Sequence, residues 1–466
     1  MAKKIFSVLL ASLSLALIFS ATLVLNYFAK DPLAGADERI RKYRMAEASI
    51  EIDLGGSPLP DARVEIEQQK HAFPFGCTLY SYTHMTGPEQ ELYFKEFHEL
   101  FNLAVVPYFW RYYEPEPDRP ELENTKALVK QFEDSGIMVF GHPLLDSNDV
   151  GSPEWLRGEA RLEDRIKSRV QREVSDYPEV SGWIVMNEPT IGWGLFPVCK
   201  WMVRKGAVDA TFDSLSWASE KNPRAVIMVN NYLTSRILDV YGAFHHFGFL
   251  PSLLAFKKMQ KRMSYPELLA RLEKKNPPPY AIGLQSHMHV VEWPLWYTDR
   301  VIDQYQKFKR PIYFTEITIL SGEHRMINWS KMSASGPWKN LPEREPGQAD
   351  YAEKFYTLLF SRPEVDGIIW FEFADLHAFL GVPGGLLRED LSRKPSYLKL
   401  HHLIKEKWWT RLTVKTDAQG MINFSGFFGS YTARVYDQNG VPQKFEFELV
   451  KNSPNRFVFQ LAPNPQ

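Results

Sequence analysis

The sequence predicts a closed (β/α)8 TIM barrel with a small β-sandwich-like accessory domain, which N-terminal and C-terminal strands form together. Eight apolar runs alternate with segments of helical period through the middle of the chain. Polar or aromatic side chains stand at or just beyond the ends of most of these runs. Segments of strand-like alternation, without helical period, flank this region on both sides. Alternating strands and helices are typical of parallel α/β folds, and the flanking pattern is typical of a separate β unit.

Composition limits the functional classes. The chain has 466 residues, 44% of them hydrophobic and 14% aromatic, which is enough for one large core and a small extra domain. Lys and Arg total 55 against 56 for Asp and Glu, so no basic field favours nucleic acid as a partner. The only cysteines, Cys77 and Cys199, are too few for a disulfide framework or a zinc cluster, although one bridge between them stays open. We therefore expect no cofactor and no metal.

The amino terminus predicts export. Lys3 and Lys4 precede an unbroken stretch of apolar or small residues from Ile5 to Leu25. Residues 1–29 are expected to be a signal peptide or a membrane anchor, and the pattern leaves both open. The stretch contains no cysteine, which excludes bacterial lipid attachment there. The protein is thus expected to be secreted, periplasmic or membrane-anchored facing outside, with residues 5–25 as the attachment if they are retained.

The accessory domain is predicted from two separate segments. Residues 30–70 contain a charged spacer, from Lys30 to Arg44, and then SIEIDL and RVEIEQQ on either side of the turn-like GGSPLPDA, which predicts a β-hairpin. Residues 409–466 show short alternating strands separated by DAQG, GFFG, DQNG and NSPN. Because a lone hairpin is marginally stable, we expect it to pair with this tail in one β-sandwich beside the barrel.

Residues 71–408 form the predicted barrel. Leu162, Ile166, Val170 and Val174 recur at four-residue spacing between two apolar runs, as in an amphipathic helix. An open, doubly wound sheet would alternate in the same way, but it seldom needs eight units, and no Gly-rich phosphate loop follows the first strand. The eight runs are FPFGCTL, LAVVPY, IMVFGH, GWIVMNE, AVIMVNNY, AIGLQSH, PIYFTEI and GIIWFEF.

Two glutamates stand at the ends of such runs. Glu188 ends GWIVMNE and Glu316 ends PIYFTE, so each carboxylate is expected at the carboxyl end of a parallel strand, where barrel enzymes carry their chemistry. Glycoside hydrolysis needs such a pair. One polar residue after a strand is commonly a helix cap or turn former, but many at one rim indicate a site. The other strand-end residues are Arg111, His142, Asn187, Asn230, Asn231, Tyr232, Gln285, His287, Trp370 and Glu372.

Seven motifs in order resemble glycoside hydrolase family 10, the retaining endo-β-1,4-xylanases. They are FPFG, GHPLL, WIVMNEP, VNNY, GLQSH, FTEITI and KPSY, and they extend from about Phe73 to Ile404. The ordered set is specific, whereas NEP alone would fit several related barrel glycosidases. The resemblance implies polysaccharide degradation, with a polysaccharide or oligosaccharide as the partner.

The resemblance also implies roles for individual residues. Glu188 would be the acid/base and Glu316 the nucleophile, with their carboxyl groups about 5–5.5 Å apart as retaining chemistry requires. The ionised nucleophile would then raise the pKa of the acid. The implied substrate-binding residues are Asn187 at the sugar 2-hydroxyl, His142 at another hydroxyl, His287 and Gln285 in the nucleophile's network, and Trp370 as an aromatic floor. Arg111 and Tyr232, at the ends of the second and fifth runs, are further candidates.

Three departures from the family pattern concern the substrate more than the reaction. Residues 107–112 read PYFWRY where typical xylanases carry Glu-Asn-x-x-Lys-Trp, Asp146 replaces a Trp, and Thr318 replaces an Asp. We expect Arg111 and Asp146 to contact a substituted, branched or acidic sugar, or else to pair with each other or with solvent. A metal site of His287, His289 and Glu316 is disfavoured, because alternate strand residues face opposite sides.

Two non-enzymatic alternatives stay open at this point. A catalytically inactive polysaccharide-binding barrel on a membrane anchor would stack sugars on the aromatic residues between Tyr108 and Tyr113. A signalling or adhesion ectodomain would need only the apolar amino terminus and the β tail. The presence of both glutamates together with Asn187 and His287 favours the hydrolase.

Overall fold

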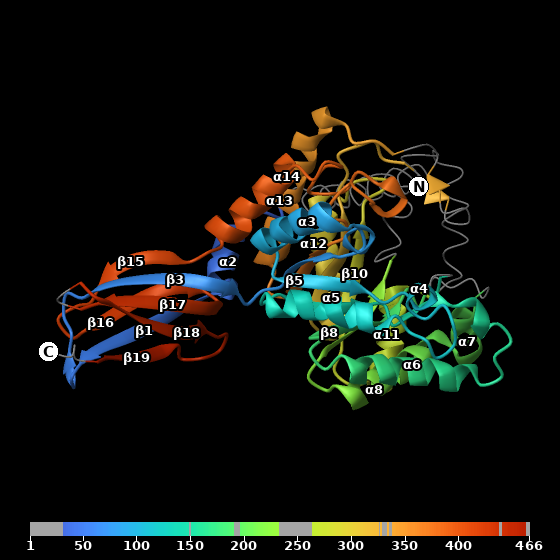
Figure 1. Cartoon of the computed structure of the whole chain (residues 1–466), viewed down its shortest axis with the longest axis horizontal. Coiled ribbons are helices and arrows are strands. Elements are labelled where there is room, and N and C mark those ends of the chain that lie inside the picture. The colour runs from blue at the N-terminus through green and yellow to red at the C-terminus, as the bar shows by residue number, and fades with distance from the viewer. Residues whose placement is uncertain are drawn as a thin grey trace, which may run out of the picture.

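The computed structural model describes residues 31–148, 151–190, 196–232, 263–325, 327–328, 333–334, 338–437 and 440–462. Within them a barrel surrounded by helices lies beside a two-sheet sandwich (Figure 1). The predicted leader, residues 1–29, falls outside this part of the chain. Among the helices in the described ranges, none combines the length and apolar character needed to span a membrane.

The barrel is a closed parallel sheet. Its strand order is β6-β5-β4-β14-β11-β10-β9-β8-β7, and β6 also pairs with β8, which closes the ring. The short β7 follows β6 and pairs with the same neighbour, β8, so β6 and β7 together count as one strand of the ring. The ring therefore has eight strand positions, as the eight apolar runs predict. The strands are β4 (Phe75–Thr78), β5 (Leu103–Pro107), β6 (Met138–His142), β7 (Leu145–Asp146), β8 (Gly182–Asn187), β9 (Val226–Asn231), β10 (Ala281–His287), β11 (Ile312–Thr318) and β14 (Val365–Trp370).

Helices cover the outside of the ring. The predicted stripe on α6 is buried in the core between ring and helices, because its spacing places these apolar side chains on one face. The helices of the barrel region are α3 (Gly87–Leu100), α4 (Trp110–Tyr113), α5 (Leu122–Asp134), α6 (Leu162–Asp176), α7 (Pro197–Lys205), α8 (Ala207–Lys221), α11 (Tyr265–Glu273), α12 (Leu295–Tyr305), α13 (Glu345–Ser361) and α14 (Pro395–His402). A π-helical segment, Leu403–Lys407, follows α14.

A second, smaller cluster of apolar side chains fills the inside of the ring. Every strand position of the ring except β4 contributes one or two residues to this cluster. The cluster is separate from the core that lies under the helices. Because side chains alternate along a strand, its members mark which positions face inward. They are Leu103, Val105, Phe140, Ile184, Met228, Ala281, Tyr313 and Ile369. Two residues further along a regular strand, the inward side chain reaches the mouth of the barrel.

The sandwich joins both ends of the described chain. One sheet contains β1, β2, β16 and β19, and the other contains β3, β15, β17 and β18 (Figure 1). The strands are β1 (Met45–Leu54), β2 (Ser57–Pro58), β3 (Arg63–His71), β15 (Arg411–Lys415), β16 (Met421–Phe427), β17 (Gly429–Tyr436), β18 (Pro442–Leu449) and β19 (Arg456–Leu461). The expected union of N-terminal and C-terminal strands in one sandwich is therefore present.

The expected hairpin, however, is wrong. β1 and β3 lie in different sheets, and only the two-residue β2 pairs back onto β1 after the turn. The apolar faces of the two strands instead share one core, in which Ile50 and Ile52 lie with Val64 and Ile66. Stacking the two sheets buries both apolar faces against each other, whereas a single isolated hairpin would leave its apolar face in water.

The predicted charged spacer is largely helical. It contains α2 (Ala36–Arg44), whose last residue is buried against the barrel. The Arg44 guanidinium donates hydrogen bonds to the carbonyl oxygens of Phe360, Arg362 and Val365 at 2.6–2.7 Å. This side chain thus attaches the start of the sandwich to the helical layer of the barrel. Both cysteines are buried and unbridged.

Candidate active site

Glu188 and Glu316 share an unusual backbone geometry at the strand ends. Glu188 directly follows β8 and Glu316 lies near the end of β11, and each has a φ of 54°. Positive φ is uncommon for a side-chain-bearing residue and is associated with functional sites. The register of each strand also shifts shortly before or around the glutamate, between Ile184 and Met186 in β8 and between Phe314 and Ile317 in β11. These irregularities change which face the following side chains occupy.

Three side chains hold the carboxylate of Glu316. Asn230 Nδ2 donates to Glu316 Oε1 at 2.6 Å, and His142 Nε2 lies 3.1 Å from the same oxygen. His287 Nε2 lies 2.9 Å from Oε2. Burial by itself would raise the pKa of Glu316, but His142 and His287 outweigh it and hold that pKa well below its usual range. Glu316 is therefore an oriented carboxylate at neutral pH.

Glu188 is in the opposite electrostatic situation. It is partly exposed, its Oε2 accepts a 2.6 Å hydrogen bond from Asn148 Nδ2, and its backbone N–H donates to Asn230 O at 2.8 Å. Desolvation, followed by the negative charges of Asp146 and Glu316, raises its pKa to about 8. The amide groups of Asn148 and Gln285 offset only part of this increase. Glu188 is therefore a carboxylic acid at neutral pH.

Buried amides connect the two glutamates. Asn187 Oδ1 accepts hydrogen bonds from Asn230 Nδ2 at 2.8 Å and Gln285 Nε2 at 3.1 Å. Asn187 Nδ2 then donates to Asp146 Oδ2 at 2.7 Å. Asn230 Oδ1 accepts from Thr315 Oγ1 at 2.6 Å, which leaves its amide to face Glu316. In Asn187 and Asn230 the amide oxygen accepts hydrogen bonds while the amide nitrogen donates them, so the network fixes the orientation of both amides.

His287 is held on three sides. Its Nδ1 lies 2.9 Å from Thr318 Oγ1, so a hydroxyl occupies the place where the family pattern has a carboxylate. His289 stacks on the ring at 4.8 Å, and Phe371 packs edge-on at 4.7 Å. Across the described ranges no group of three or more His, Cys, Asp or Glu side chains is arranged to hold a metal ion. The Nε2 of His287 is directed at Glu316 instead.

The structure gathers most of the predicted residues around the glutamates but not all of them. Asn187, His142, His287 and Gln285 belong to the networks just described. Arg111 lies on α4 at the rim, where it forms a 2.9 Å ion pair with Glu154, and Tyr232 is half-buried just after β9. Asp146 does not take Arg111 as its partner, because its two oxygens accept hydrogen bonds from Asn187 and Asn148.

Trp370 is not where the resemblance places it. Its ring is fully buried 6.2 Å from that of Tyr356 on α13, and its indole N–H donates to Gly384 O. The predicted role as an aromatic floor is wrong for this side chain. Ile369 points into the ring, so its neighbour Trp370 must point outward, and the next inward residue is Phe371, the one that packs on His287.

Asn148 and Phe371 were not singled out from the sequence, and Asn230 was noted only as a strand-end residue without a role. Asn230 and Phe371 each lie two residues beyond an inward-facing apolar residue, Met228 or Ile369. A period of two counted along each strand would have found both. Asn148 gives no such signal, because it lies beyond β7 in a loop.

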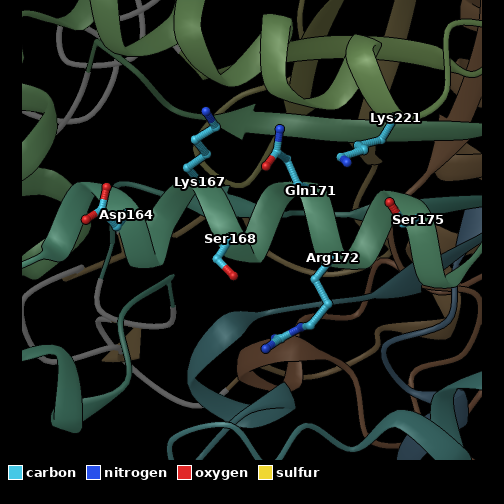
Figure 2. A pocket seen from close by; sticks show the side chains of 7 residues that line it. All are labelled: Asp164, Lys167, Ser168, Gln171, Arg172, Ser175 and Lys221. Atoms are coloured by element: carbon cyan, nitrogen blue, oxygen red, sulfur yellow. The ribbon is translucent and has the colours of Figure 1, made fainter.

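A surface hollow elsewhere does not compete with this site. It has a volume of about 420 Å³ and lies along the outer face of α6, with Lys221 of α8 on its other side (Figure 2). Its lining is Asp164, Lys167, Ser168, Gln171, Arg172, Ser175 and Lys221. None of these is a strand-end residue, so the hollow shares nothing with the two glutamates.

Comparison with known proteins finds no protein family model that matches the chain. An endo-1,4-β-xylanase 5-like protein of Arabidopsis thaliana is 24% identical over 74% of this chain and 53% of its own length. The anti-sigma-I factor RsgI6 of Acetivibrio thermocellus is 22% identical over 90% of this chain and 48% of its own length. The chain therefore spans about half the length of the first curated relatives it matches. Endo-1,4-β-xylanase B of Thermotoga neapolitana is 23% identical over 69% of this chain and 85% of its own length.

Solved structures agree on the fold. Xylanase 10B of Thermotoga petrophila, in complex with xylobiose, superposes with a TM-score of 0.54 at 19% identity, over 72% of this chain and 95% of that one. Native xylanase 10B of Thermotoga maritima gives the same TM-score and identity over 72% and 96%. At this identity the likeness shows the barrel fold, and two of the three curated relatives described above are named endo-1,4-β-xylanases. Both comparisons thus agree with the resemblance drawn from the motifs: the chain has the barrel fold of glycoside hydrolase family 10 xylanases and is similar in sequence to proteins named endo-1,4-β-xylanase.

Proposed function

We propose that the protein is a retaining glycoside hydrolase that cleaves a β-linked, xylan-like polysaccharide with Glu188 as acid/base and Glu316 as nucleophile. The observation that carries this proposal is the contrast between the surroundings of two glutamates at one barrel mouth: Glu316 contacts His142, His287 and Asn230, whereas Glu188 faces the carboxylates of Asp146 and Glu316. The pKa of Glu188 is raised to about 8, while that of Glu316 is held well below its usual range. Two carboxyl groups whose environments drive their pKa values apart are suited to opposite roles in one reaction.

The reaction proceeds in two displacements. First, a Glu316 oxygen bonds to the anomeric carbon, the bond from that carbon to the leaving oxygen breaks, and Glu188 gives its proton to the leaving oxygen. Second, a water oxygen bonds to the same carbon, the bond to Glu316 breaks, and the water's proton passes to Glu188. The products are two shortened saccharides, and both glutamates return to their starting protonation states.

Within the described residues, Asn187 has one amide hydrogen left for the substrate. Its amide nitrogen has two hydrogens, of which one goes to Asp146. The second is available to a sugar 2-hydroxyl beside the anomeric carbon, an interaction that strengthens as the transition state forms. His142 and His287 orient the nucleophile, so their main contribution is to Glu316 and not to sugar recognition.

The sugar-binding rim differs from that of ordinary xylanases, and we propose that Arg111 and Tyr232 contact the saccharide there. On α4 the exposed Tyr112, with 63% of its surface accessible, lies next to Arg111. An aromatic face can stack on a sugar ring, and a planar guanidinium can form bidentate contacts with an acidic group, which the compact ammonium of a lysine cannot do. These features support a substituted or acidic side group on the substrate chain.

We also propose export through residues 5–25, which the apolar leader and the preceding lysines support. Fractionation of cells that express the full chain, with antibody detection of the barrel, tests this. Recovery of the protein in the cytosol with its leader intact would contradict it.

The function is tested with purified residues 30–466 on a panel of plant and microbial polysaccharides, with the product anomer followed by proton NMR. The expected first product carries the same anomeric configuration as the substrate. An inverted product would refute Glu316 as the nucleophile. Tight binding to a polysaccharide without any cleavage, under all pH conditions, would instead support the inactive binding barrel.

A further inference from the structure

A third carboxylate lies in the active centre. Asp146 is at the end of β7, directly opposite Asn187 of β8 in the strand register, and only 1% of its surface is exposed. The position is one at which the chain departs from the family pattern, which has an apolar tryptophan there. A charged side chain in this place is costly unless it is fully hydrogen-bonded.

Asp146 is satisfied as an acceptor at both oxygens. Asn187 Nδ2 donates to Oδ2 at 2.7 Å, and the backbone N–H of Asn148 donates to Oδ1 at 2.6 Å. The Asn187 amide has no freedom to turn round, since its own oxygen already receives hydrogen bonds from Asn230 and Gln285. A protonated Asp146 would need an acceptor where these contacts supply donors, so the arrangement fits the ionised form.

Asn148 and Asn187 each connect Asp146 to one of the two glutamates. Asn148 uses its side-chain amide to donate to Glu188 Oε2 at 2.6 Å. Asn187 is bonded to Asn230, which in turn donates to Glu316 Oε1 at 2.6 Å. One buried carboxylate therefore fixes a separate hydrogen-bonded path to each of the two reacting groups.

We propose that Asp146 is a positioning residue that braces Asn148 and Asn187 against the two glutamates and keeps a negative charge beside Glu188 after Glu316 has become an ester. This inference rests on the proposed retaining mechanism. In a site with two carboxylates, the charge that keeps the acid protonated disappears when the nucleophile is glycosylated. Here a second charge remains, so the proton on Glu188 is retained more strongly in the intermediate.

The electrostatics of the surrounding groups agree with this. After desolvation, Asp146 is the largest influence raising the pKa of Glu188, ahead of Glu316. Burial raises the pKa of Asp146 itself, with a smaller increase from Glu316, while Asn187, the Asn148 backbone and His142 lower it. Within the described residues, the titratable groups around Asp146 and the two glutamates include His142 from β6, Glu188 after β8, His287 from β10 and Glu316 from β11.

The expected effect of Asp146→Asn has a definite sign in each half-reaction. Without the charge, Glu188 loses its proton at lower pH, so the basic limb of the kcat/KM profile on an unactivated oligosaccharide shifts to lower pH. With a dinitrophenyl glycoside, whose kcat reports breakdown of the intermediate, the variant works faster at neutral pH because more Glu188 is present as base. Loss of packing alone would lower both constants without moving either limb.

Asn148→Ala is the opposing variant. Its amide lowers the pKa of Glu188, so its removal shifts the basic limb to higher pH, opposite to Asp146→Asn. It leaves the buried carboxylate in place, so it serves even if the Asp146 variant does not fold. Asp134→Asn is the matched charge control, because this carboxylate is 60% exposed and pairs with Lys130 on the far side of α5. It should move neither limb.

A readout independent of turnover is the carbon-13 NMR titration of labelled glutamate carboxyls, with Glu188 assigned by Glu188→Gln. The midpoint of Glu188 should fall in Asp146→Asn and rise in Asn148→Ala. An unchanged midpoint in a folded Asp146→Asn protein, or shifts of the same sign in both variants, would overturn the inference. If the titrations behave as expected but no glycoside is hydrolysed, the retaining mechanism fails while the coupling of Asp146 to Glu188 stands.

Discussion

His287 Nε2 lies 2.9 Å from Glu316 Oε2, and the opposite ring nitrogen lies 2.9 Å from Thr318 Oγ1. Because His287 contacts both residues, the side chain at position 318 influences the orientation of the ring that faces the nucleophile. With a hydroxyl in place of a carboxylate, the ring is oriented by a neutral partner.

Thr318→Val is expected to loosen this contact. The variant keeps the shape of the side chain but leaves His287 Nδ1 facing a methyl group, which should lower the free energy of unfolding by about 1–3 kcal/mol. We expect kcat to fall about tenfold as Glu316 loses its fixed orientation. Thr318→Ser, which retains the hydroxyl, is the control. Equal kcat values for the Val and Ser variants in steady-state assays would show that the contact does not orient the nucleophile.

Glu316→Ala removes the nucleophile and is expected to reduce kcat by about four orders of magnitude or more. Substrate affinity, measured by calorimetry on an uncleaved oligosaccharide, should remain within about tenfold of the native value, because the rim residues are untouched. Gln171→Ala, on the outer face of α6, is the control. Turnover by the Glu316 variant at the native rate would rule out double displacement through this residue.

Glu188→Ala should separate substrates by leaving group. Cleavage of an unactivated saccharide falls by about 10²–10⁴-fold, while the first displacement on a dinitrophenyl glycoside is nearly unaffected, since that leaving group needs no proton. Added azide should restore turnover of the activated substrate and yield a glycosyl azide of retained configuration, because a small anion can enter without base assistance. Mass spectrometry and NMR of the product provide the check; an azide of inverted configuration contradicts the mechanism.

The pH profile follows from the two pKa directions. Glu316 stays ionised throughout the neutral range, and Glu188 stays protonated until its pKa of about 8, so kcat/KM should form a broad plateau that declines near pH 8. A basic limb near pH 5 would contradict the assignment.

The same shift predicts a pH-dependent stability. Because the folded pKa of Glu188 lies above the unfolded value of 4.5, the folded state holds a proton that the unfolded state releases as the pH rises from about 4.5 to 8. The contribution of Glu188 to native stability therefore declines across this window. The glutamine of the Glu188→Gln variant cannot ionise. The Tm of this variant minus the Tm of the native protein should therefore increase from pH 4 to pH 8. Calorimetric scans that show a constant difference in Tm would count against a raised pKa.

Arg44→Met tests the junction between sandwich and barrel. The substitution keeps an apolar stem but removes three hydrogen bonds to backbone carbonyl oxygens, which should cost about 2–5 kcal/mol in the free energy of unfolding. Arg41→Met, an exposed position on the same helix, is the control and should change stability by less than about 0.5 kcal/mol. Equal denaturant midpoints for the two variants would refute the role of Arg44.

What the sequence determined by itself is local in origin. Apolar runs of strand length and helical stripes need only nearby residues, so all eight barrel strands and the core face of α6 were predictable, and so were the strand ends from which Glu188 and Glu316 emerge. The imidazoles beside Glu316 and the amides of Asn187 and Gln285 followed from a family resemblance carried by ordered motifs, whereas the contacts of Asn230 and Asn148 with the glutamates did not.

Only the tertiary structure decided how these elements share space. It placed β1 and β3 in opposite sheets, turned Trp370 outward and Phe371 inward, and made Asp146 a buried partner of Asn187. Strand pairing depends on which apolar faces can be buried together, and the facing of a strand-end side chain depends on bulges. The opposite pKa shifts of the two glutamates arise from burial and from charged groups on other strands of the ring, which meet only when the ring closes.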